Sequence, residues 1–377
     1  MTSTVYNTTK HDYAKNPMFF GKKLGVYRED QLKYPVLLDL AEIQRGLTWQ
    51  PQDTNLTQDK VDYELKLEFI QRFIYSENLK YQTTLDTVNA RGVNLVISPH
   101  VSLPELESFI LWWAAFEDLH STSYQYMLKQ VYANPTPIID DIYENSSINS
   151  RMKTMVNYYD GLLNTSEENK EKNLLMLLYS INALEAIRFY VSFVCTFAFD
   201  RANIMCGSSK IIGYIARDES IHYKAVTFII NQLQNGNEGK KWKALCEETK
   251  QAAVDIFNQV LSEEMDWIDH LFQYGEPDFL SKSLLQEKLK WYTAKTMKNL
   301  DLPINFDYPK QNPMRWVEDT YLNFSGVQNA NQDQTSIAYM SDLTTDNLTP
   351  DKLTALSNFL NGAELSIGEE KYLTSLI

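Results

Sequence analysis

Apolar residues recur every three or four positions over most of this chain, which is the spacing of amphipathic helices. The pattern predicts helices over 59–90, 102–132, 138–145, 149–163, 171–204, 209–234, 240–273 and 281–298. Residues 1–58 look mostly irregular, with short helical pieces around 28–47. Only 13 Gly and 12 Pro occur in 377 residues, and clean alternation of apolar and polar residues is scarce. We therefore expect an all-α fold, a bundle of long helices.

Two helix ends carry local signals. The helix over 59–90 stops at Arg91–Gly92, and the next helix follows Ser102. Ser102 and Glu105 have the spacing of a capping box, and Pro104 is tolerated in a first turn. From about 325 the chain becomes polar, so we expect one helical domain over 1–324 and a flexible C-terminal tail over 325–377.

The most apolar segment, residues 174–199, is long enough to cross a membrane. Glu185 and Arg188 lie in its middle, where a membrane-spanning helix would tolerate them poorly. We interpret this segment as a buried helix of a soluble protein, with no membrane partner.

The composition narrows the class of protein further. A formal net charge of −14 argues against nucleic-acid binding, which needs a basic surface. No basic N-terminal region precedes an apolar stretch, so we expect no secretory signal. Three cysteines without CxxC spacing indicate free thiols in a reducing compartment, and hence a cytoplasmic protein.

Two Glu-x-x-His motifs lie in apolar surroundings. Trp113, Glu117, His120 and Tyr124 share one helical face, within FILWWAAFEDLHSTSY. Glu219 and His222 share another, within IIGYIARDESIHYKAV. A single such pair is more often a solvated pair on a surface helix. Two copies on strongly apolar helices instead indicate a metal site, because a buried carboxylate is costly unless it is paired or bound to metal.

Di-iron helical bundles add one carboxylate from each of two further helices to two Glu-x-x-His motifs. Glu185 qualifies because it shares an apolar face with Ile181, Phe189 and Phe193 and has no obvious partner. Asp86 qualifies as the fourth member, near the end of a helix that also looks buried. Two ferric ions with one bridging oxide carry four positive charges, which four carboxylates neutralise. The HExxH order of zinc peptidases is absent.

These motifs resemble those of a known family. NLKYQTTLD, the Glu-His-Tyr stretch, NALEAIRFYVSF and IARDESIH are similar to the small, radical-generating subunit of class I ribonucleotide reductase, of the type found in enteric bacteria and their phages. The likeness extends from residue 16 to about Tyr339. It implies a ferritin-like bundle in the cytoplasm, or in the host cytoplasm if the chain is phage-encoded.

The resemblance implies a role for each motif residue. Asp86, Glu117 and His120 would hold one iron, and Glu185, Glu219 and His222 would hold the other. Tyr124 would be oxidised to a stable tyrosyl radical, and Phe189 and Phe193 would line a dry pocket around it. Ordinary core packing is the alternative for both phenylalanines, and a core tyrosine with a bonded hydroxyl is the alternative for Tyr124 taken alone. Manganese stays open because the ligand sets of the two metals overlap.

The resemblance also implies transfer of the radical to a large catalytic subunit, bound through the C-terminal tail. Trp49 and Asp218 match the transfer route, with Asp218 bonded to the outer nitrogen of His120, and Tyr339 matches the exit tyrosine. The resemblance implies a homodimer as well. The chain departs from the family in a short loop at 164–172 and in an apolar extension after residue 360, which leaves the exact segment that binds the large subunit open.

The function implied is assembly of an oxo-bridged di-iron centre with O2, followed by radical transfer for the reduction of ribonucleotides to deoxyribonucleotides. A di-iron oxidase or hydroxylase is an alternative that needs an open substrate pocket and no tail. An iron-storage bundle is another alternative. Such a protein should lack a tyrosine placed like Tyr124 and would rarely need a region like that around Trp49.

Overall fold

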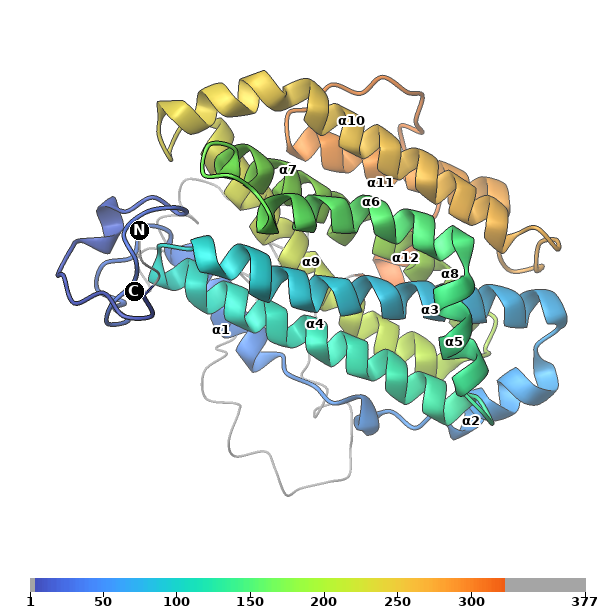
Figure 1. The fold of residues 1–377 in the computed structure, drawn as a ribbon. Coiled ribbons are helices and arrows are strands. Elements are labelled where there is room, and N and C mark those ends of the chain that lie inside the picture. Colours follow the sequence, from blue (N-terminus) through green and yellow to red (C-terminus); the bar gives the residue numbers. More distant parts are fainter. Residues whose placement is uncertain (1–3, 323–377) are drawn as a thin grey trace. The chain divides into compact units, whose positions relative to one another are not determined.

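The computed structural model describes residues 4–322, and helices make up most of this part (Figure 1). A single antiparallel bridge between Phe19 and Val101 is the one β-interaction found in residues 4–322. The α-helices are α1 (Pro35–Gly46), α2 (Thr57–Val61), α3 (Phe69–Gly92), α4 (Pro104–Val131), α5 (Thr136–Glu144), α6 (Ser146–Leu163), α7 (Lys170–Ala183), α8 (Phe189–Arg201), α9 (Cys206–Gln234), α10 (Lys240–Leu271), α11 (Lys282–Asn299) and α12 (Arg315–Thr320).

Shorter helical pieces complete the described chain. Three are π-helical turns: η3 (Asp62–Lys66), η4 (Val93–Ile97) and η6 (Leu184–Arg188). Three are 3₁₀ turns: η1 (Tyr13–Lys15), η2 (Pro51–Asp53) and η5 (Ser98–His100). The all-α prediction is thus confirmed, and the predicted helices lie where the pattern of apolar residues put them. The helix expected over 59–90 is interrupted, because Leu67 is extended between η3 and α3.

The described chain forms two compact units, one of residues 4–53 and 91–116 and the other of residues 54–90 and 117–322. In the first unit the N-terminal segment is fastened to the start of α4. The backbone N–H of Phe20 donates to the carbonyl of His100, and that of Ser102 donates to the carbonyl of Met18. Trp49 also lies in this unit and is buried.

The capping box predicted for α4 is wrong. The hydroxyl of Ser102 donates to the carbonyl of Pro17 and accepts from the backbone N–H of Gly21. Glu105 accepts from the backbone N–H groups of Lys33 and Tyr34, at 2.9 Å each. Both side chains therefore bond the N-terminal segment instead of each other's backbone. A sequence pattern could not reveal this, because the partners lie about 70 to 85 residues away in the chain.

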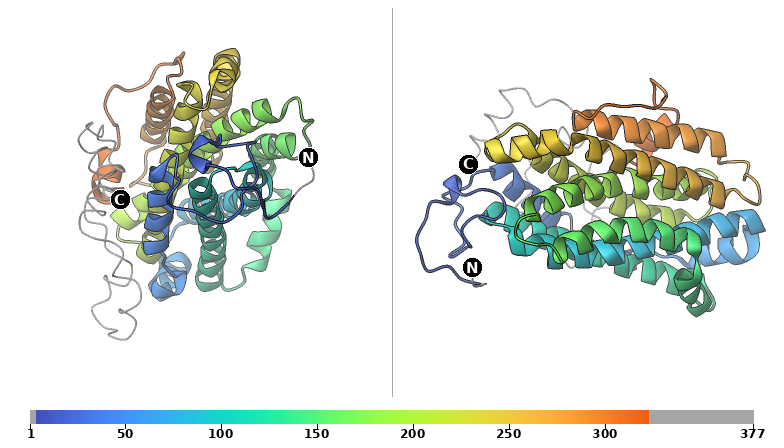
Figure 2. Two further views of the ribbon diagram at one scale, coloured as in Figure 1. Left: turned by 90° about the vertical axis from the view of Figure 1, so that its left-hand side faces the viewer. Right: turned by 45° about the horizontal axis from the view of Figure 1, so that its top comes forward.

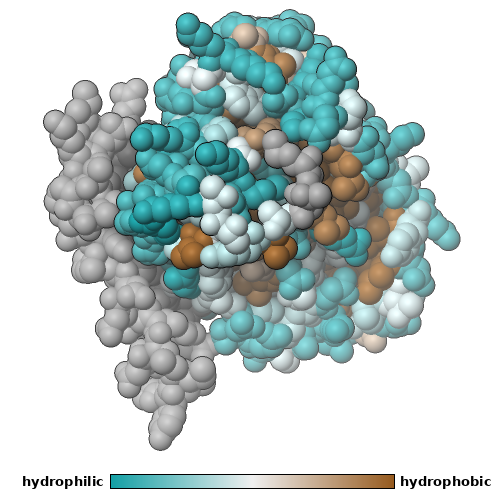
Figure 3. Space-filling view, turned by 60° about the vertical axis from the view of Figure 1, so that its left-hand side comes forward, coloured by the Kyte–Doolittle hydropathy of each residue, from teal (hydrophilic) through white to brown (hydrophobic). Residues whose placement is uncertain are grey.

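The second unit is a bundle of long helices that run side by side (Figures 1 and 2). Helix α7 packs against α6, α9 and α10, while α8 packs against α9, and α11 against α10. Lys170–Arg201 is long and apolar enough to cross a membrane, but its apolar window is fully buried inside the protein. It is the core of a soluble protein, as predicted. On the face drawn in Figure 3, hydrophilic residues predominate and hydrophobic ones gather in small patches.

The N-terminus of α9 is held by carboxylates from distant parts of the chain. Asp59 accepts from the backbone N–H groups of Gly207 and Ser208, at 3.0 and 2.6 Å, and satisfies donors that a helix start leaves unpaired. A Cβ on Gly207 would lie 2.6 Å from a methyl carbon of Leu56, so only glycine allows this close approach. This anchoring fixes the helix that carries Glu219 and His222.

The segment Lys170–Arg201 departs from the regular helix that its sequence predicts. Between α7 and α8 the chain forms the π-helical turn η6, in which the N–H of Phe189 donates to the carbonyl of Leu184. Because η6 is π-helical, Ile181, Glu185 and Phe189 do not share the regular α-helical face that the sequence predicts. The cysteines are free thiols, as predicted. The predicted tail over 325–377 lies outside the described residues, and the division at residue 324 stays a prediction.

Candidate metal centre

Six buried side chains converge inside the helical bundle. Each has 0 % of its surface exposed. They come from four elements of the second unit, and they are Asp86 on α3, Glu117 and His120 on α4, Glu185 on η6, and Glu219 and His222 on α9. The structure thus brings together all six residues predicted as metal ligands. That they hold metal ions stays a prediction at this point.

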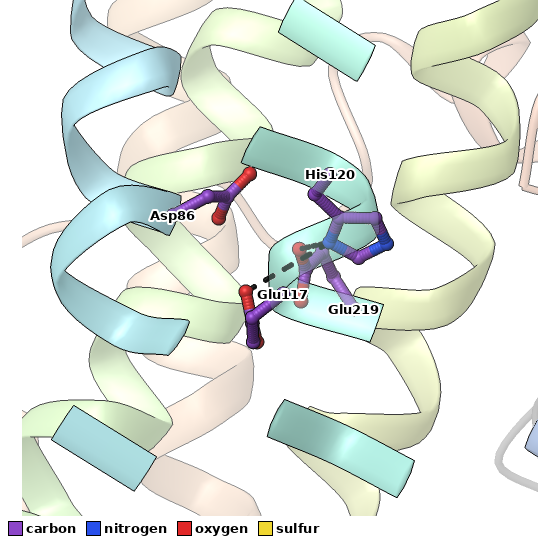
Figure 4. Close-up of side chains that lie close together, drawn as sticks. All are labelled: Asp86, Glu117, His120 and Glu219. Carbon is purple, nitrogen blue, oxygen red and sulfur yellow. Dashed lines mark ion pairs between the residues drawn. The ribbon is translucent and has the colours of Figure 1, made fainter. Parts of the chain in front are cut away.

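The first group consists of Asp86, Glu117, His120 and Glu219, whose ligand atoms all lie within 4.8 Å of one another (Figure 4). The Nδ1 atom of His120 lies 2.9 Å from Oε1 of Glu219 and 3.8 Å from Oε2 of Glu117. Asp86 projects from α3 toward these side chains. Carboxylate oxygens and one imidazole nitrogen therefore surround a single point, a donor set that suits iron or manganese.

The second group consists of Glu117, Glu185, Glu219 and His222, also within 4.8 Å of one another. The Nδ1 atom of His222 lies 2.8 Å from Oε2 of Glu219 and 3.3 Å from Oε1 of Glu117. Glu117 and Glu219 belong to both groups. The resemblance assigned each of them to one metal, whereas the structure places both of them in both groups.

A residue that the sequence analysis missed ties the two groups together. The side-chain amide of Asn89 donates to Oε1 of Glu117 at 2.8 Å and to Oε1 of Glu185 at 2.9 Å. Its carbonyl oxygen accepts from the hydroxyl of Tyr159, which fixes which way the amide points. Asn89 lies three residues after Asp86 and thus on the same face of α3. That spacing was the one signal in the sequence that could have identified Asn89. Asn89 is thus the partner that Glu185 lacked in the sequence analysis.

Charge is concentrated strongly at this site. Burial and the charge of Glu117 raise the pKa of Asp86 well above its usual range, and burial and Glu219 do the same to the pKa of Glu185. Burial disfavours the imidazolium of His120, but the carboxylate of Glu219 raises its pKa well above the usual value. Burial also opposes ionisation of Glu219, yet His120 lowers its pKa. His120 and Glu219 therefore attract each other, whereas burial and neighbouring carboxylates disfavour the anions of Asp86 and Glu185.

The protein groups alone leave polar atoms unsatisfied. Among the described residues, neither oxygen of Asp86 has a hydrogen-bond partner of good geometry, nor does Oε2 of Glu185. Buried carboxylate oxygens without partners are costly, and native proteins rarely tolerate them. Positive metal ions at the two groups would satisfy these oxygens. The donor set therefore fits a pair of metal ions.

A further carboxylate, that of Asp218, orients the ring of His120 through its outer nitrogen. The outer nitrogen of its ring, Nε2, lies 3.3 Å from Oδ2 of Asp218, the contact that the resemblance implied. Arg217 donates from Nε and from a terminal nitrogen to the other oxygen of Asp218, at 3.1 and 3.0 Å. With a proton on Nε2, the Nδ1 atom of His120 would be free to bind a metal ion among the carboxylates. Such second partners commonly orient metal-bound histidines.

Tyr124 lies one helical turn after His120 and is fully buried. Its hydroxyl has no hydrogen-bond partner of good geometry among residues 4–322, although Asp86 lies near enough to act on it electrostatically. Burial and the charge of Asp86 raise the pKa of Tyr124 well above its usual value. Phe189 and Phe193 are buried and stack with ring centres 5.6 Å apart. Tyr339 lies outside the described residues.

A helical bundle that buries carboxylates and two histidines in two overlapping groups defines a dinuclear metal carboxylate protein. Comparison with known proteins refines this class. The family model described as "Ribonucleotide reductase, small chain" matches residues 29–313. The ribonucleoside-diphosphate reductase 1 subunit beta of Escherichia coli O157:H7 is 35% identical over 374 residues, covering 92% of this chain and 99% of the relative. The corresponding subunit of Enterobacteria phage T4 is 36% identical over 369 residues, covering 90% and 95%.

Solved structures show the same fold. The ribonucleotide reductase R2 subunit from Clostridium botulinum matches with a TM-score of 0.74 at 21% identity, covering 85% of this chain and 98% of that one. The dimanganese(II)-NrdF of Streptococcus sanguinis matches with a TM-score of 0.61 at 18% identity, covering 74% and 93%. The chain belongs to the ribonucleotide reductase small-chain family. It is a ribonucleoside-diphosphate reductase beta subunit, the radical-generating component of that enzyme.

We predict that Asn89→Leu weakens metal binding. The change removes both hydrogen bonds that align Glu117 with Glu185, and loss of such partners typically lowers metal affinity by roughly 10- to 100-fold. A titration of the metal-free protein with Fe(II) or Mn(II) measures this affinity.

Asn78→Leu is the matched control for this prediction. Asn78 is also a buried asparagine of α3, but its side chain accepts from the indole N–H of Trp267. The control should lose stability without losing metal affinity. Equal affinities for the parent and Asn89→Leu would contradict the role given to Asn89.

Proposed function

We propose that this chain binds two iron ions with Asp86, Glu117, His120, Glu185, Glu219 and His222. We propose further that it uses O2 to oxidise Tyr124 to a tyrosyl radical, and that the radical passes to the large catalytic subunit, where ribonucleotides are reduced. In this assignment Glu117 and Glu219, which belong to both groups, would help to hold both ions. Membership of the family and the convergence of the six side chains support this proposal. The same donors also accept manganese, and analysis of the bound metal distinguishes the two.

The observation that carries the proposal is the buried hydroxyl of Tyr124. Asp86 is its near polar partner, but no hydrogen bond of good geometry satisfies it. A poorly satisfied buried hydroxyl is costly, so a purely structural tyrosine at this place is difficult to justify. A radical site has a different requirement, because the hydroxyl must lose its proton when the ring is oxidised. Asp86 is the carboxylate whose charge acts most strongly on this hydroxyl. We assign a carboxylate oxygen of Asp86 as the acceptor of that proton.

When bound, the metal pair supplies with O2 the one-electron oxidation that tyrosine requires. The remaining work belongs to the side chains of this protein. The surroundings of Tyr124 exclude water, since the hydroxyl is fully buried. Phe189 and Phe193 would contribute to this exclusion from α8. A site without water or reductants prolongs the life of a radical.

Asp218 connects the centre to the proposed transfer route. It contacts the outer nitrogen of His120 with one carboxylate oxygen, while Arg217 holds the other. Trp49 would follow Asp218 in the route, and Tyr339 would be the exit residue; both assignments rest on the resemblance. Asp218 is therefore the residue of this route whose assignment is supported by a contact in the structure, the one with His120.

As a beta subunit, the chain associates with an alpha subunit. We assign this contact to the C-terminal tail over 325–377, and we expect a homodimer in the cytoplasm. Both assignments follow from the family.

Tyr124→Phe tests the proposed function most simply. We expect the variant to bind two metal ions per chain and to consume O2, because all six ligands remain. It should show no stable tyrosyl signal by electron paramagnetic resonance and no ribonucleotide reduction, because phenylalanine has no hydroxyl proton to lose and is much harder to oxidise. The midpoint of thermal unfolding should fall little, since the lost hydroxyl has only a poorly aligned contact with Asp86.

Tyr126→Phe provides the control on the same helix. The hydroxyl of Tyr126 donates to the carbonyl of Thr54, so this variant loses a hydrogen bond but should keep the radical signal. A tyrosyl signal of unchanged shape in Tyr124→Phe would move the radical to another tyrosine. Turnover without any radical would overturn the mechanism.

Asp218→Asn tests the transfer route. With its amide oxygen toward Nε2 of His120, the asparagine still orients the imidazole but loses the two hydrogen bonds from Arg217. At saturating metal we therefore expect the metal pair and the radical to form. Turnover with the large subunit should be lost, because the neutral amide cannot relay charge as the carboxylate does. The control is Asp118→Asn, which changes an exposed carboxylate on α4 next to Glu117 and should leave turnover intact. Normal turnover of Asp218→Asn would remove Asp218 from the route.

A further inference from the structure

A second set of buried charges lies in the larger unit, apart from the proposed ligands. Arg188 and Glu264 are at most 2 % exposed, and Arg151 is 4 % exposed. One terminal nitrogen of Arg188 donates to Oε1 of Glu264 at 3.0 Å, and the other donates to Oε2 of Glu263. The hydroxyl of Tyr81 also donates to Oε1 of Glu264, at 2.6 Å. Neither metal binding nor radical formation, as derived above, uses these groups.

Burial of this ion-pair cluster needs an explanation. Replacing a buried ion pair by apolar residues is often neutral or stabilising, so such a pair is weak evidence for a role in stability alone. The guanidinium of Arg188 forms three directed contacts at once, with Glu263, Glu264 and the hydroxyl of Tyr81. Planar geometry of this kind fixes the position of the backbone that carries it.

That backbone is the π-helical turn η6. Arg188 is the last residue of η6, and the proposed ligand Glu185 lies three residues before it. A π-helical turn is rare, and such turns occur frequently at functional sites. Within η6, Glu185 is bonded to Asn89 on α3, while Arg188 is bonded to α10 and to Tyr81 on α3. The two ends of the turn are thus fastened to different parts of the bundle.

We propose that Arg188 is a positioning residue for the metal centre, which, with Glu263, Glu264 and Tyr81, holds the π-helical turn η6 so that Glu185 points at the second metal position. Arg188 acts through the backbone and does not touch the metal ions. The inference rests on the proposed role of Glu185 as a ligand. Without this anchor the turn is free to relax toward a regular α-helix, which rotates Glu185 away from Glu117, Glu219 and His222.

Arg188→Lys tests the inference while it preserves the buried positive charge. A lysine ammonium cannot reproduce the planar fork that joins Glu263 and Glu264. We expect the affinity for the second metal ion to fall by roughly 10- to 100-fold, as it does when partners of metal ligands are lost. The affinity for the first ion should stay unchanged. A Mn(II) titration followed by electron paramagnetic resonance separates the two, because a single ion and a coupled pair give different spectra.

Arg151→Lys is the matched control. Arg151 belongs to the same cluster, donates to the backbone carbonyl of Glu263 and stacks over Trp267, but it lies on α6, and its hydrogen bonds and ion pair among residues 4–322 go to Ser147, Glu263 and Glu264 instead of η6. We expect the two variants to lose a similar amount of thermal stability. Only Arg188→Lys should bind the second metal ion with lower affinity. Equal second-ion affinities in Arg188→Lys and the parent would overturn the inference, as would the same loss in both variants.

Two further measurements keep the outcome interpretable. If Arg188→Lys does not fold, the paired replacement Arg188→Met with Glu264→Met removes both charges together, and we expect the same loss of second-ion affinity. Amide hydrogen exchange at Phe189 in the metal-free protein should be faster in either variant, since its N–H closes the π-helical turn. Failure of the parent to bind two ions would refute the proposed function itself, whereas two ions bound equally well by parent and variants would refute only the role of Arg188.

Discussion

The fold depends on one electrostatic constraint, which is that four carboxylates and two imidazoles are buried within a few ångströms of one another. Such a concentration of charge is costly in a protein interior, and the mutual attraction of His120 and Glu219 offsets only part of the cost. Both oxygens of Asp86 and Oε2 of Glu185 still lack hydrogen-bond partners of good geometry among the described residues. Positive metal ions bound at the two groups would meet this need.

Much of the surrounding structure maintains this arrangement. Asp59 fixes the start of the helix that carries Glu219 and His222, and Asn89 aligns Glu117 with Glu185. Asp218 orients the ring of His120, and the Arg188 cluster fastens the turn that carries Glu185. These partners come from positions far apart in the chain. The metal centre is therefore a property of the whole helical bundle rather than of a local motif.

The sequence predicted the helices and the two Glu-x-x-His pairs well, because each rests on a short repeating pattern. Asp86 and Glu185 were chosen to complete the ligand set of a di-iron bundle, and the structure places them with the two pairs. Spacing of three or four residues places Glu117 with His120, and Glu219 with His222, on single faces. The failures have a common physical origin in contacts over long distances in the chain. Ser102 and Glu105 look like a capping box, but the N-terminal segment takes their hydrogen bonds. The π-helical turn at Glu185 inserts a residue into an apparently regular pattern, and spacing alone could not reveal that Glu117 and Glu219 belong to both groups.

The central claim is that these six side chains hold two metal ions. The most direct measurement is a crystal structure of the metal-loaded protein, with anomalous diffraction data collected on both sides of the iron absorption edge. The account predicts two anomalous peaks per chain, one among Asp86, Glu117, His120 and Glu219, and the other among Glu117, Glu185, Glu219 and His222. A single peak, or peaks at other residues while these carboxylates stay unliganded, would contradict it.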